Sequence, residues 1–208
     1  MNFDVLLDRV AADDPAAGQA LIAAGAPAVG PVLQTLCDEA SPIPWYRLTA
    51  VLQRMGEAAF GPLATALAAA PTAEVARRCS AAFIHLDVPD KAIYRSALRH
   101  RSPAVRAAAA SALQAEPFLP DLIELLDDPD PDVRQRAVWA CAVIGPAAIP
   151  ALRAVRRGPG RRRRAALTTL ADIGGWAALE AADQHAVTRL IEVKALGETP
   201  APMHLCGS

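Results

Sequence analysis

Apolar residues recur along this chain at the spacing of an amphipathic helix, and the clearest run begins and ends on recognisable signals. Asp130 and Pro131 stand at its start, where a capping carboxylate and a ring with fixed φ favour the first helical turn, and Gly145 ends it. Between them the apolar positions fall on one helical face: Val133, Ala137, Val138, Cys141 and Ile144. The pattern predicts a helix between residues 130 and 145.

The same pattern returns along the chain at a nearly constant interval. Ser102-Pro-Ala-Val105 and Pro71-Thr-Ala-Glu-Val75 open two further runs of this kind. The positions equivalent to Val133 follow one another at steps of 31, 31, 30, 28 and 29 residues: Asp13, Pro44, Val75, Val105, Val133 and Arg162. A period this regular indicates an internal structural repeat.

A second helix start alternates with the first. It occurs as Gly25-Ala-Pro-Ala-Val-Gly-Pro31, Gly56-Glu-Ala-Ala-Phe-Gly-Pro62 and Gly145-Pro-Ala-Ala-Ile-Pro150, and an apolar stripe follows each copy. Each unit therefore reads as helix, short turn, helix. One such pair cannot bury both of its flanks, so stacking of about six pairs is expected. We expect this all-α stack over residues 1–196, with acidic residues capping its N-terminal end, and an irregular, proline-containing tail over 197–208.

The repeat resembles a known family. Gly145, Ala148 and Leu152 in the first helix, with Asp132-Val133-Arg134 and Ala137 in the second, resemble the HEAT-like repeats first described with phycobiliprotein lyases. The resemblance covers roughly residues 10 to 180. It implies a right-handed α-solenoid of the armadillo type, whose second helices line a concave face. Because such repeats serve many tasks, it indicates the fold more strongly than the function.

Composition agrees with closely packed helices. Aromatic residues are only 4% of the chain, and much of the 53% of hydrophobic residues is alanine, which favours helices over sheets. The four cysteines form no C-x-x-C pair, which favours a reducing, cytoplasmic setting without disulfides. Residues 15–37 carry no charge, but glycines and prolines break them, so we expect a soluble protein without a membrane span.

One repeat departs from the pattern. Arg162 takes the valine position, within a group of seven arginines in twelve residues: Arg153, Arg156, Arg157, Arg161, Arg162, Arg163 and Arg164. The net charge of the whole chain is −1, so the positive charge is local. Four consecutive helical residues cannot share one face, and a helix N-terminus disfavours cations. The cluster should therefore attract negative charge.

The acids of the preceding repeat offer internal partners for these arginines, and we favour that interpretation. They occupy the equivalent turn: Asp127, Asp128, Asp130 and Asp132. The alternatives are an anionic partner, either an acidic protein surface or nucleic-acid phosphate, and a solvated loop. Arginine suits carboxylate and phosphate equally because its planar fork binds both in a bidentate manner.

An arginine also follows the valine position in several repeats. Arg106, Arg134 and Arg163 share this place, with Arg77 close to it, and stacking would align them as a ladder along one edge. Pairing with an acidic residue of a neighbouring unit is the favoured interpretation, and a ligand-facing surface is the alternative. Arg134 and the seven clustered arginines are thus the candidate binding residues.

Motifs for chemistry are missing from the sequence. There is no H-E-x-x-H pair, no phosphate-binding loop with G-K-[ST] and no G-x-S-x-G, so neither a metal, a cofactor nor a catalytic set is expected. Trp139 is expected in the core or in a groove wall.

The favoured function is a non-enzymatic scaffold that binds a protein partner through its concave groove or its arginine-rich C-terminal repeat. Two alternatives remain open. One is a nucleic-acid-binding or DNA-processing protein resembling the alkylpurine glycosylases built from similar repeats. The other is an accessory subunit, or the N-terminal part of a larger modifying enzyme.

Overall fold

The computed structural model describes residues 1–155 and 160–174, with positions 184 and 188, and consists there of helices joined by short turns. No strand occurs within those residues. In chain order, the elements that we group as first and second members of six pairs are α1 (Phe3–Ala11) with α2 (Pro15–Ala24), α3 (Ala26–Cys37) with α4 (Trp45–Met55), α5 (Glu57–Ala68) with α6 (Ala73–Ile84), η1 (Lys91–Ile93) and α7 (Tyr94–Ala97) with α8 (Pro103–Ala112), η2 (Glu116–Phe118) and α9 (Leu119–Leu125) with α10 (Pro131–Ile144), and η3 (Gly145–Ala148) and α11 (Ile149–Val155) with α12 (Gly160–Gly174).

The second helices begin where the sequence signals place them. The carboxylate of Asp130 accepts hydrogen bonds from the backbone amides of Asp132 and Val133, at 2.9 and 3.2 Å. Thr72 and Asp14 cap α6 and α2 in the same way. These side chains satisfy amides that have no partner inside the helix, so the local sequence alone fixes each start.

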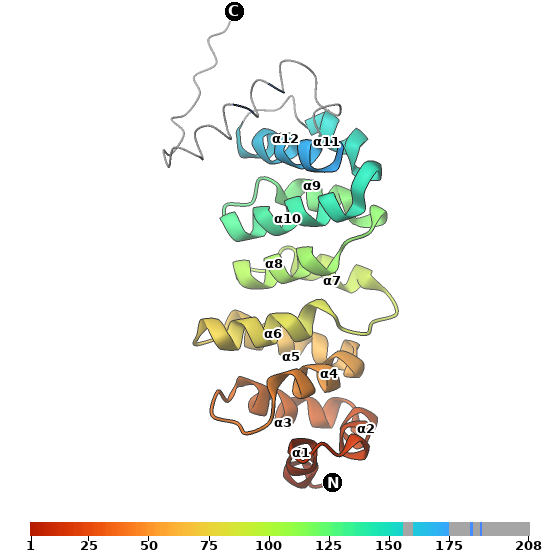
Figure 1. Ribbon diagram of the computed structural model, residues 1–208, viewed down its shortest axis with the longest axis vertical. Coiled ribbons are helices and arrows are strands. Elements are labelled where there is room, and N and C mark those ends of the chain that lie inside the picture. Colours follow the sequence, from red (N-terminus) through yellow and green to blue (C-terminus); the bar gives the residue numbers. More distant parts are fainter. Residues whose placement is uncertain (156–159, 175–183, 185–187, 189–208) are drawn as a thin grey trace, which may run out of the picture.

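The helices form two layers that run the length of the stack (Figure 1). The second helices make one continuous row, in which α4 packs on α6, α6 on α8, α8 on α10 and α10 on α12. The first helices lie behind them, as α3 on α5 and α9 on α11. This arrangement confirms the expected all-α solenoid of stacked helix pairs.

Three of the five junctions between pairs are made by one glycine. Gly25, Gly56 and Gly145 have φ of 63°, 58° and 74°, with ψ between −128° and −141°. Side-chain-bearing residues rarely adopt this conformation, so glycine allows the chain to reverse at once into the next helix. The recurring glycine seen in the sequence therefore marks these junctions.

The fourth pair is irregular. Its first helix is reduced to a 3-10 turn and the four-residue α7, and longer segments replace the glycine on both sides, residues 85–90 before the pair and 113–115 after it. The segment before the pair is fixed by backbone contact, because the amide of Asp87 donates to the carbonyl of Gln53 at 2.8 Å. The periodic pattern did not predict this shortened helix.

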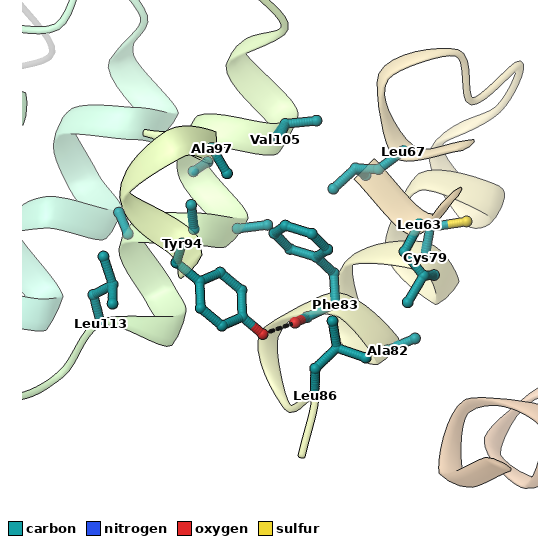
Figure 2. Close-up of a cluster of buried hydrophobic side chains, with 14 of the residues drawn as sticks. Leu63, Leu67, Cys79, Ala82, Phe83, Leu86, Tyr94, Ala97, Val105 and Leu113 are labelled. Carbon is teal, nitrogen blue, oxygen red and sulfur yellow. Dashed lines mark hydrogen bonds between the residues drawn. The ribbon is translucent and has the colours of Figure 1, made fainter. Parts of the chain in front are cut away.

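Aromatic rings join the third and fourth pairs. Phe60, Phe83 and Tyr94 pack with ring centroids 4.9 to 5.2 Å apart. The Tyr94 hydroxyl donates a hydrogen bond to the carbonyl of Phe83, across the junction (Figure 2). Its burial raises the pKa of Tyr94 to about 12, so the hydroxyl keeps the proton that it donates. Three of the chain's nine aromatic residues thus pack at the irregular junction.

The apolar faces expected from the sequence are largely buried. Val75, Val105 and Val133 are at most 1% exposed, although Val138 and Ile144 are only half-buried at the edge of α10. Trp139, expected in the core or in a groove wall, lies on the surface of α10 and is 45% exposed. Helical spacing turns it away from Ala137 and Ala140, which face the neighbouring helices.

One helical stretch, Pro131–Val155, is long and apolar enough to cross a membrane by length and composition alone. It is not one straight helix in this fold, because Gly145 turns the chain at positive φ. On either side of that turn, α10 packs in the row of second helices and α11 packs on α9. The expected tail, 197–208, lies outside the described residues.

Candidate interaction surface

Arginines of the second helices donate hydrogen bonds to backbone carbonyls at nearby helix ends and turns. Of the arginines expected to form a ladder, Arg77 instead pairs with Glu74 of its own helix. Two arginines outside that expectation, Arg47 and Arg78, bind the preceding pair. Arg47 Nη1 donates to Val10 and Ala11, at 2.9 and 3.2 Å. Arg78 Nη1 donates to Leu36 and Asp38, both at 3.3 Å. Each of these two arginines therefore closes the C-terminal end of a first helix in the preceding pair, where carbonyls lack helical partners.

Arg106 and Arg134 make a different contact. Each donates through Nη1 to the turn inside its own pair: Arg106 to His100 and Arg101, and Arg134 to Asp128 and Pro129 at 2.7 and 3.0 Å. The arginine that follows the valine position thus holds the turn that precedes its own helix. Arg134, a candidate binding residue, uses Nη1 for this structural contact.

Arg106 also forms the most buried ion pair described in the structure. Its Nε and Nη2 donate to the two carboxylate oxygens of Asp128, both at 2.8 Å, and the side chains are 14% and 6% exposed. Burial alone would raise the pKa of Asp128. The hydrogen bonds from Arg106 and the amide of Asp130, with the charges of Arg106 and Arg134, outweigh it and lower that pKa.

The acidic turn therefore faces the preceding pair. Asp128 binds Arg106, and Asp130 caps α10. Among the described residues, no ion pair joins Asp127, Asp128, Asp130 or Asp132 to Arg161–Arg164. For Arg161, Arg162 and Arg164, the internal pairing with these acids that the sequence favoured is thus absent within the described part of the chain.

Four members of the arginine cluster, Arg161–Arg164, lie in the first turns of α12. Arg161 and Arg164 are exposed, whereas Arg162 and Arg163 are half-buried. This confirms that four consecutive arginines cannot share one face. Arg162 occupies the position of the buried valines, and its Nε is buried without a hydrogen-bond partner. Arg153 is exposed on α11, and Arg153 and Arg163 each make a contact. Arg156 and Arg157 lie outside the described residues.

A second surface feature is an apolar ridge on α10. Trp139 and Val143, four residues apart on the same face, are 45% and 48% exposed. One repeat earlier, the position of Trp139 is Ser111, and those of Gln135 and Arg136 are Ala107 and Ala108. All three residues on α8 are buried. At these three positions α8 therefore carries small, buried side chains where α10 carries larger ones.

Two cysteines that are far apart in the sequence meet inside the stack. The Sγ atoms of Cys37, at the end of α3, and Cys79, within α6, lie 3.8 Å apart as free thiols. Burial, and then the neighbouring Cys37, raises the pKa of Cys79 to about 12. Burial also raises the pKa of Cys141 to about 12. Sequence spacing could not predict the pair, because it arises from packing between neighbouring pairs.

Among the residues that the structure describes, no group of three His, Cys, Asp or Glu side chains lies close enough together to hold a metal ion. The stacked helix pairs define the class of protein, which is an α-solenoid whose second helices form a continuous row. The family of HEAT repeats matches residues 94–171 and 119–197, which together span half of the chain. The chain belongs to the HEAT-repeat family. A comparison with curated proteins gives no match.

Proposed function

We propose that this protein is a non-enzymatic scaffold that binds a protein partner across the row of second helices. HEAT repeats generally mediate protein interactions, so a protein is the most plausible kind of partner for this chain. The observation that supports the proposal here is the exposed ridge of Trp139 and Val143 on α10. Tryptophan is strongly enriched among the residues that carry binding energy in protein interfaces.

The arginine-rich start of α12 supports a partner with acidic groups. Arg161 and Arg164 lie one helical turn apart on the exposed side, next to α10 in the same row. A partner that lies along the row from α10 to α12 would contact the apolar ridge of Trp139 and Val143 on α10 and the positive charge of Arg161 and Arg164 on α12. The proposal includes a cytoplasmic setting, which the cysteine usage favours, and no membrane contact, because the apolar stretch Pro131–Val155 is divided at Gly145 and packs within the stack. The resemblance of the sequence to the repeats first described with phycobiliprotein lyases adds no activity to the proposal.

Co-purification from the native host tests the proposal. Trp139→Ala should reduce recovery of the partner at least tenfold by quantitative mass spectrometry. Tyr46→Ala should not, because that ring is also exposed, at 57%, but lies at the start of α4. Both variants should keep the helical circular dichroism of the unchanged protein. A set of recovered proteins that is identical for the two variants would contradict the proposal.

The nucleic-acid alternative makes a separate prediction for the same preparations. Binding to phosphates should weaken steeply between 50 and about 200 mM salt and should depend on Arg161 and Arg164. A retained, nuclease-sensitive nucleic acid that is lost on changing both arginines to Ala, with no effect of Trp139→Ala, would replace the protein scaffold by a nucleic-acid-binding function.

A further inference from the structure

An open cavity lies beside the irregular fourth pair. It has a volume of about 280 Å³ and lies where the C-terminal ends of α6 and α8 meet η1 and η2. Its walls include Ile84, His85 and Lys91 on one side, with Ser111, Gln114 and Phe118 on the other. The cavity therefore occurs where the longer segments replace the single-glycine junction. It lies at the opposite ends of the second helices from the arginine cluster.

The walls of this cavity are held in place. The segment before η1 is tied to the preceding junction by the hydrogen bond from Asp87 to Gln53, and the Asp90 side chain caps η1 by accepting from the amide of Ala92 at 2.8 Å. On the other side, the Gln114 amide donates to the carbonyl of Ser111. These contacts form the cavity before any ligand arrives, which lowers the entropic cost of binding.

The lining of the cavity includes one cation, Lys91. Lys91 is one of only two lysines in a chain with 19 arginines, and no Asp or Glu lies among the lining residues. Its ammonium group donates one hydrogen bond, to the carbonyl of Leu86 at 3.2 Å, and lies 5.3 Å from the centre of the Tyr94 ring. Burial lowers the pKa of Lys91, and the charge of Asp87 opposes that shift. The ammonium group of Lys91 is thus a partly desolvated cation, and it has N–H groups that can donate further hydrogen bonds to a ligand.

The cavity also has apolar walls. Ile84 and Phe118 face it together with Ala112 and Ala115, and the Phe118 ring is held by the guanidinium of Arg95, 5.1 Å from its centre. One cation set among short apolar side chains suits a carboxylate carried on methylene groups. Its volume lies near the lower end of the roughly 300–1,000 Å³ that small-molecule sites commonly span, so the cavity admits a small ligand or one side chain.

We propose that this cavity binds the acidic side chain of an extended peptide segment, with Lys91 pairing with its carboxylate and Ile84 and Phe118 packing against its methylene groups. The site is separate from the Trp139 ridge, so it adds a second contact point and does not depend on the proposed partner of the ridge. A peptide segment can reach the cavity because the cavity is open to the surface, and the test below distinguishes it from a free small acid.

Titration with defined peptides tests this site. Acetyl-Leu-Glu-Leu-amide should shift the backbone amide NMR signals of Ser111 and Gln114 in the unchanged full-length chain, and its Gln counterpart should bind at least tenfold more weakly. Lys91→Met should weaken binding of the Glu peptide at least tenfold, and Lys91→Arg should restore part of it. Arg99→Met is the matched control, because it removes an exposed cation outside the cavity and should leave binding unchanged.

Three outcomes would overturn the site. They are no shift of Ser111 or Gln114 at millimolar Glu peptide, equal binding of the Glu and Gln peptides, and equal loss in Lys91→Met and Arg99→Met. Hexanoate serves as the free-acid probe. If hexanoate shifts the two signals and the peptide does not, the cavity is a small-carboxylate site and the peptide proposal is wrong. Because the first comparison uses the unchanged protein, a poorly folded variant cannot obscure the result.

Discussion

At the scale of single residues, the pair of Arg106 and Asp128 joins two neighbouring helix pairs through two charge-assisted hydrogen bonds. Its geometry is bidentate, and the carboxylate is almost fully buried. A buried pair of this kind contributes less than its attraction suggests, since both charges lose water, but removal of one member leaves the other uncompensated. The pair should therefore be more sensitive to single substitutions than to joint replacement.

Asp128→Asn should reduce the free energy of unfolding by about 3 kcal/mol at pH 7, because Arg106 then loses its counter-charge. Asp127→Asn is the control, because the carboxylate of Asp127 is exposed and forms no ion pair among the described residues. Urea denaturation of both variants gives the comparison. Equal midpoints for the two would mean that the Arg106–Asp128 pair contributes nothing.

The same variant has a predictable pH dependence. Because the folded state lowers the pKa of Asp128, the pair's contribution is complete above the ordinary aspartate value of about 3.9 and is lost as pH falls below it, through the folded pKa. The difference in stability between the unchanged chain and Asp128→Asn should therefore shrink below about pH 4. If the difference in stability instead grew on acidification, the pKa of Asp128 would be raised in the folded state and our assignment would be wrong.

At the scale of elements, the glycine junctions differ in how closely they are packed. A Cβ atom at Gly56 would lie 2.4 Å from the carbonyl oxygen of Asp87, whereas at Gly25 it would meet no atom within 4 Å. Both glycines have positive φ, so both positions disfavour a side chain. Only Gly56 also makes room for the long segment that enters the fourth pair.

Gly25→Ala should cost about 1–2 kcal/mol, for backbone strain alone. Gly56→Ala should cost on the order of 3 kcal/mol or more, because the Asp87 backbone must also move. Thermal or urea unfolding of the two variants measures the difference. A smaller loss for Gly56→Ala than for Gly25→Ala would show that the segment after α6 yields easily, and would weaken the case for a preformed cavity.

The helix starts were predictable from sequence, whereas the surface was not. Asp130, Thr72 and Gly145 act on the residues next to them, so their positions reveal the helix ends directly. The partner of Arg106, the meeting of Cys37 with Cys79 and the cavity at Lys91 depend on packing between pairs. The arginine cluster was visible in the sequence, but the orientation of Asp128 toward Arg106 could not be deduced from spacing.

At the scale of the whole molecule, stability should vary along the stack. In a solenoid each pair contacts only its neighbours, so interior pairs gain from two interfaces and the terminal pair from one. Within the described residues, α8 is the most enclosed second helix, with Ala107–Ser111 all buried, whereas α1 leaves much of its surface exposed.

Backbone amides of α8 should therefore exchange with solvent most slowly, and those of α1 at least a hundredfold faster, when native-state hydrogen exchange is followed by mass spectrometry. Intermediate rates are expected for α4 and α6. Equal protection from α1 to α8 would instead indicate that the stack opens as one cooperative unit, contrary to expectation for a chain of nearest-neighbour contacts.

The polar contacts between pairs bear on how such a chain can grow by duplication. Arg47 and Arg78 donate hydrogen bonds to the C-terminal ends of α1 and α3. Tyr94 donates to the carbonyl of Phe83, and Arg106 pairs with the carboxylate of Asp128. A single copied pair inserted elsewhere would face a neighbour without the matching group. Lengthening the gene by copying two adjacent pairs together would preserve the junction between them, so the irregular fourth pair would be inherited with its neighbours.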